Sequence, residues 1–184
     1  MKRLPNPPEV CHWLICGLAA LLISFRPAGA TAASAGQMIS AFRATCELGF
    51  GDLARLKTAA AATHFAVEPI TDRLPKSLVA SRDGLWLVYR GASAEKDVPV
   101  PQCFIEMHDD SPGEYEKTVG LVRQAFGLGE GSHRTHPGTQ STRWPWQTEG
   151  TGGLQLILTS EILAGEPRLR LGIQNKWRGR NNDL

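Results

Sequence analysis

The cysteines are the residues of this 184-residue chain whose chemistry is most specific. Cys11 and Cys16 lie in an N-terminal segment that we expect to be removed, which leaves Cys46 and Cys103. An even number of cysteines in an oxidising compartment favours pairing, so we predict a Cys46–Cys103 disulfide. A redox-active Cys-x-x-Cys spacing is absent, and zinc would need two further ligands at no recognisable spacing.

His108, Asp109 and Asp110 form a second candidate, at the end of a predicted strand. A histidine beside carboxylates could bind a metal ion or transfer protons. Neighbouring residues of an extended chain, however, point in alternating directions, and strand-to-helix loops favour polar residues in general. Ordinary loop chemistry is the favoured interpretation. A small exported hydrolase or metal-dependent enzyme that uses His108 and Asp109 is the alternative.

A third candidate is the pair His133 and His136, three residues apart in the glycine-rich segment 127–138. Such a pair could chelate a metal ion on a helix, but the glycines and Pro137 predict a loop. We therefore predict neither a metal site nor a cofactor.

The sequence contains no recognisable local motif for nucleophilic catalysis or nucleotide binding. There is no Gly-x-Ser-x-Gly elbow, and the glycines at 127, 129 and 131 follow a predicted helix instead of opening one. A non-enzymatic role is favoured for this reason. Enzyme activity stays open as the alternative, because active sites are assembled in space and not in sequence.

Trp144 and Trp146 are the strongest candidates for ligand binding. Two tryptophans two residues apart on a strand project to the same face, where they could stack on a sugar ring or seat a peptide. The alternative is that both rings fill the core beneath the helices, and this alternative is favoured in a domain with few aromatic residues.

The elements that position these residues can be read from apolar spacing. Helical patterning covers 37–46 and 52–64, and strand-forming residues follow at 85–89 and 102–107, with a hairpin loop between them. Ser111, Pro112 and Glu114 suit a capped helix start, and Gly127 ends that helix. Three more strands are expected, at 142–147, 154–160 and 168–174.

The predicted order is two helices, two or three strands, a helix and three strands, written αα-βββ-α-βββ, and it predicts the fold class. Short connections between successive strands favour antiparallel pairing. We expect an α+β domain in which the helices pack on one face of a mostly antiparallel sheet of about five to six strands.

The N-terminus has the layout of an export signal. Lys2 and Arg3 precede an uncharged apolar run of 13 residues, 13–25. That length fits a signal core of about 7 to 15 residues better than a membrane span of about 20, although an uncleaved anchor is the alternative. Small residues suit cleavage after Ala30, Ala32 or Ala35. We predict a signal peptide at 1–35 and a single domain at 36–184, periplasmic or secreted, with no transmembrane segment in the mature chain.

Removal of this segment changes the charge of the protein. It contains three of the 20 basic and one of the 18 acidic residues, so 17 of each remain and the formal charge is zero. Long-range attraction to nucleic acid is therefore not expected. The sequence favours a small exported binding protein whose partner is a protein or small ligand of the cell envelope.

Overall fold

The computed structural model describes residues 33–68, 76–92, 101–108, 113–146 and 153–175. All of them belong to a compact unit, Thr31–Leu184. Most of the predicted signal segment lies outside the described residues. The elements, in chain order, are α2 (Ala35–Phe42), the π-helix η1 (Arg43–Glu47), α3 (Leu53–Ala62), β1 (Ala66–Val67), β2 (Ser77–Arg82), β3 (Leu85–Arg90), β4 (Gln102–His108), α4 (Glu114–Phe126), β5 (Ser132–His136), β6 (Thr139–Trp146), β7 (Leu154–Leu163) and β8 (Glu166–Asn175).

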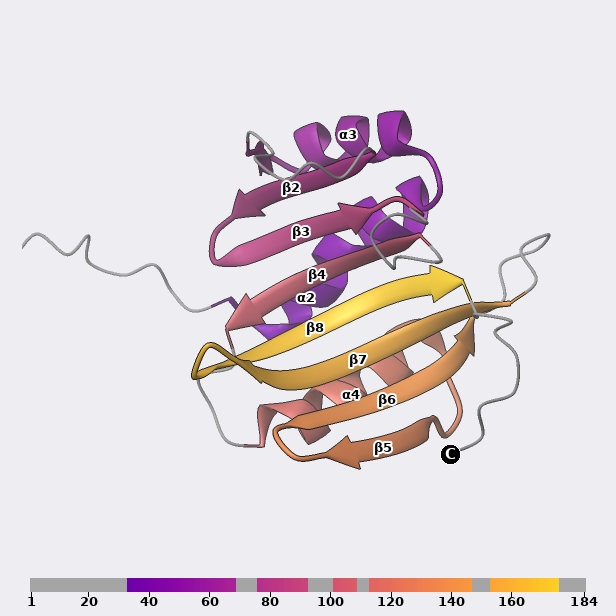
Figure 1. The fold of residues 1–184 in the computed structure, drawn as a ribbon. Helices are drawn as coiled ribbons and strands as arrows, with labels where there is room; N and C mark the ends of the chain where they lie inside the picture. The colour runs from indigo at the N-terminus through magenta and orange to yellow at the C-terminus, as the bar shows by residue number, and fades with distance from the viewer. Residues whose placement is uncertain (1–32, 69–75, 93–100, 109–112, 147–152, 176–184) are drawn as a thin grey trace, which may run out of the picture. The chain divides into compact units, whose positions relative to one another are not determined.

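The strands form one antiparallel sheet of eight, in the order β1-β2-β3-β4-β8-β7-β6-β5. It consists of two four-stranded meanders that are joined where β4 pairs with β8 (Figure 1). The predicted fold, with five to six strands in the order αα-βββ-α-βββ, is therefore wrong. Each half of the chain contributes four strands, and the order is αα-ββββ-α-ββββ.

The missed strands carry weak sequence signals. β1 has only two residues, both exposed. All five residues of β5 are exposed, so this edge strand has no apolar alternation, and its glycine-rich surroundings resemble a loop. The segment nevertheless pairs with β6 through a two-residue turn at Pro137 and Gly138, where Gly138 has a φ of 73°.

The helices pack on one side of the sheet. α2 contacts β4 and β8, α3 contacts β2, and α4 contacts β7 (Figure 1). Strand residues at alternate positions point into this layer and are fully buried there, among them Leu87, Ile105 and Leu171. No helix in the described part of the chain has the length and apolar character that crossing a membrane requires.

Two helix starts differ in kind. Ser34 caps α2, where its side chain accepts a hydrogen bond from the Gln37 backbone N–H and the Gln37 side chain bonds the Ser34 N–H in return. Ser111 and Pro112, the predicted cap and first helical residue of α4, lie outside the described residues, and α4 begins at Glu114. Gly113 takes the N-cap position with a φ of 89°, a left-handed conformation that favours glycine, so Glu114 becomes the first helical residue instead of the third.

A disulfide connects the helix layer to the centre of the sheet. Cys46 on η1 and Cys103 on β4 lie at bonding distance, with Cα atoms 5.5 Å apart. Both residues are completely buried.

Candidate functional site

The side of the sheet opposite the helices, here called the outer face, carries a mixed polar and apolar surface. Strand register places its residues in rows across the sheet, because alternate residues of a strand point to the same side. One row runs from Phe104 through Gly172 and Ile157 to Arg143. The next row contains Glu106, Arg170 and Thr159.

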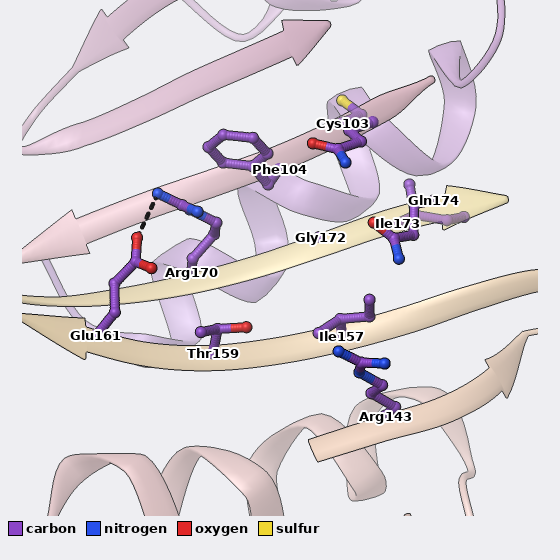
Figure 2. A pocket seen from close by; sticks show the side chains of 11 residues that line it. Cys103, Phe104, Arg143, Ile157, Thr159, Glu161, Arg170, Gly172, Ile173 and Gln174 are labelled. Carbon is purple, nitrogen blue, oxygen red and sulfur yellow. Dashed lines mark ion pairs between the residues drawn. The ribbon is translucent and has the colours of Figure 1, made fainter. Parts of the chain in front are cut away.

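Gly172 leaves a gap in the first row. A Cβ atom at this position would lie 2.9 Å from the Cβ of Phe104 and 3.2 Å from the carbonyl oxygen of Cys103, so β4 lies too close here for β8 to carry a side chain without a shift. The result is a hollow of about 270 Å³ with Gly172 at its floor (Figure 2). Its walls include Phe104, Arg170, Glu161, Thr159, Ile157 and Arg143.

One edge of the hollow is held by an ion network around Glu106. This carboxylate is 6% exposed and accepts hydrogen bonds from Arg168 and from Arg170, whose Nη2 lies 2.8 Å from Oε2. Arg170 also pairs with Glu161 at 2.7 Å. Figure 2 marks this ion pair with a dashed line. The Arg170 guanidinium lies 4.3 Å from the centroid of the Phe104 ring. These contacts therefore hold the Arg170 side chain in one position over the Phe104 ring.

The charge state of Glu106 follows from these partners. Burial is the largest influence and by itself would raise the pKa of Glu106. The hydrogen bonds and positive charges of Arg168 and Arg170 together outweigh it, so that the pKa of Glu106 lies below its usual value. Glu106 is thus a fixed, ionised anchor and not a proton donor at neutral pH.

Arg143 lies at the opposite side of the hollow, beside Ile157 (Figure 2). Its Nε is buried without a hydrogen-bond partner, and no described carboxylate forms an ion pair with it. Burial and, to a smaller extent, the nearby charge of Arg134 lower the pKa of Arg143. A partly buried guanidinium without a counter-ion gains more from an anion than an exposed one does.

Trp144 and Trp146, the candidate binding pair for which the core interpretation is favoured, lie on the helix side. Trp144 is 1% exposed and Trp146 is 9% exposed. The indole N–H of Trp144 donates to the Gly129 carbonyl at 3.2 Å, and the Trp146 ring packs edge-on against Phe126. Both rings are part of the hydrophobic core and offer little surface to a ligand.

The histidine candidates are separated by the fold. His108, at the end of β4, lies with its Nδ1 3.7 Å from Glu166, while Asp109 and Asp110 lie outside the described residues. His133 and His136 sit on a strand and not in a loop, and their odd spacing directs them to opposite faces. No cluster of three or more His, Cys, Asp or Glu side chains suited to a metal ion occurs in the described ranges.

Apart from Cys103, the residues of the hollow were not singled out from the sequence. Arg168 and Arg170 resemble a solvated strand face when they are considered without their partner across the sheet. Glu106 could have pointed to the ion network, because it is a carboxylate within the apolar stretch of β4. A carboxylate buried at such a position requires a cationic neighbour. Arg143 carries no such local signal.

The described residues thus combine a walled hollow, a fixed acidic anchor and an unpaired guanidinium on one sheet face. Comparison of the chain with protein-family models, with curated proteins and with solved structures finds no match.

Proposed function

We propose that this chain is an exported, non-enzymatic binding protein that holds a small ligand in the hollow of the outer face. The observation that carries the proposal is the hollow itself, which combines apolar walls with a few polar groups that converge on one space. Ligand sites in proteins have this composition. Its volume of about 270 Å³ is close to the lower end of the usual range, about 300–1,000 Å³, and suits a small molecule.

Export is supported by two independent features. The N-terminal sequence has a basic start, a short apolar core and small residues at cleavage spacing. Cys46 and Cys103 lie at disulfide distance, and such bonds persist in oxidising compartments such as the periplasm. The proposed location is the periplasm or the extracellular medium.

The binding role is tested by nuclear magnetic resonance of the mature protein with a mixed set of neutral, anionic and cationic small molecules. We expect at least one compound to shift the backbone amides of Phe104, Thr159 and Gly172. Thr159→Trp, which places a large ring in the hollow, should abolish those shifts. Thr58→Trp, on the exposed surface of α3, is the matched control and should leave them unchanged.

Amide shifts confined to other surfaces, or shifts that persist in a folded Thr159→Trp protein, would contradict the proposed site. The hydrolase that uses His108 and Asp109 stays a prediction with its own test. Hydrolytic activity that His108→Ala abolishes without loss of folding would favour it.

A further inference from the structure

We propose that the hollow binds a small carboxylate with a flat apolar body, and that Arg143 holds the carboxylate group. This inference rests on the proposed binding function and deepens it by naming the ligand class. It starts from Arg143, the one cation of the hollow that forms no ion pair with the described residues.

Among the described arginines whose Nε is buried without a hydrogen bond, Arg143 is the one that forms no ion pair. Arg82, Arg123 and Arg168 also have a buried Nε without a hydrogen bond, but each of them forms an ion pair, with Asp83, Glu130 and Glu106 respectively. In the part of the chain that the structure describes, Arg143 has none. An arginine fork that forms no ion pair suits the two oxygens of a carboxylate.

The charge of the site favours a ligand with a single negative charge. Three charged side chains line the hollow, Arg143, Arg170 and Glu161. Arg170 is already paired with Glu161 and Glu106, so Arg143 is the one cation among the described lining residues that no carboxylate pairs with. A phosphate dianion would bring a second, unmatched negative charge close to Glu161, whereas a carboxylate would not.

The remaining walls suit the rest of such a molecule. Ile157 and Phe104, the latter 6% exposed, line the hollow on the two sides of Gly172 (Figure 2). The Thr159 hydroxyl and the Gln174 amide add hydrogen-bonding groups at the rim. A planar ring fits between the apolar walls, because Gly172 leaves the space that a side chain would otherwise fill.

Benzoate and benzamide test this assignment, because they share size and shape and differ in charge. In the mature protein, benzoate at millimolar concentration should shift the amides of Ile157, Thr159 and Gly172, and benzamide should bind at least about tenfold more weakly. Arg143→Gln should weaken benzoate binding by a similar factor. Arg55→Gln removes the same charge from the exposed surface of α3 and should have no effect.

Arg143→Lys keeps the positive charge and provides a second variant if Arg143→Gln does not fold. We expect weaker benzoate binding in it as well, because lysine cannot donate two parallel hydrogen bonds. Benzoate binding that is unchanged in a folded Arg143 variant would overturn the inference. Inorganic phosphate that binds more tightly than benzoate would do the same.

The two proposals fail in different ways. If benzamide produces the same shifts with equal affinity, the carboxylate assignment is wrong, while binding on the outer face stands. If no compound of the mixed set or of this series shifts the outer face, both proposals are wrong.

Discussion

Glu106 on β4 lies directly opposite Arg170 on β8, and Arg170 donates two hydrogen bonds to one oxygen of this carboxylate, at 2.8 and 3.2 Å. The pair spans the junction between the two meanders of the sheet. Arg168, two residues before Arg170, bonds the other oxygen. A single buried acid therefore connects the two halves of the domain on the outer face, as the Cys46–Cys103 disulfide connects the helix layer to the sheet.

Replacement of Glu106 should destabilise the fold strongly. Glu106→Gln keeps the volume of the side chain but leaves Arg168 and Arg170 without a buried negative partner. We expect a loss of about 2–3 kcal/mol in the free energy of unfolding, measured by urea denaturation. Glu116→Gln, on the exposed surface of α4, is the matched control and should change stability by less than about 0.5 kcal/mol. Equal stability of the two variants would show that the network contributes little.

The same residue should make stability fall in acid. Because the pKa of Glu106 in the folded protein is lower than in the unfolded chain, its contribution is fully present above the ordinary glutamate pKa of about 4.5 and is lost as the pH falls through the folded value. The unfolding free energy of the wild-type protein should therefore decline below about pH 4.5 more steeply than that of Glu106→Gln. Parallel pH profiles of the two proteins would contradict this account.

Loss of the disulfide should lower stability by up to about 4 kcal/mol, because the bond closes a loop with a sequence separation of 57 residues and restricts the unfolded chain. The measurement is urea denaturation of the mature protein with and without reductant. A protein with both Cys46→Ser and Cys103→Ser is the control and should show no response to reductant. Two free thiols in the protein isolated without reductant, detected by alkylation and mass spectrometry, would rule out the bond.

The mature N-terminus should lie before Ser34. Ser34 caps α2 through a reciprocal pair of hydrogen bonds, and Ala35 is 2% exposed. Cleavage after Ala35 would remove both residues and cost about 1 kcal/mol for the lost cap alone. We therefore expect cleavage after Ala30 or Ala32, measured by intact mass or N-terminal sequencing of the exported protein. A chain that starts at Gly36 would contradict this expectation, and one that starts at Met1 would contradict cleavage itself.

Tryptophan fluorescence should report a buried pair. In a mature protein that carries Trp86→Phe and Trp177→Phe, the remaining emission comes from Trp144 and Trp146. Because both rings are nearly inaccessible, we expect blue-shifted emission and weak quenching by iodide, which cannot enter the core. Strong quenching in the folded state would instead favour a stacking surface. Unfolding in urea serves as the internal control and should restore quenching.

Local patterns predicted the elements that bury an apolar face. Leu169, Leu171 and Ile173 alternate on β8, and the spacing of Tyr115, Val119 and Val122 matches α4. Such patterns arise because burial on one side imposes the period of the element on the sequence. β5 follows no such pattern, since an exposed edge strand pairs through its backbone without burying an apolar face, and its side chains are free to be polar.

The sequence by itself determined the alternation of β8, the cysteine pair and the export-like N-terminus, because each of these depends on residues close together in the chain or on simple counting. Only the tertiary structure decided that Glu106 meets Arg170, 64 residues away, and that Gly172 separates Phe104 from Ile157. Register between distant strands sets these contacts, and register results from the packing of the whole sheet. The hollow, and the position of Arg143 beside it without an ion pair to the described residues, therefore follow from the tertiary structure and not from the local sequence.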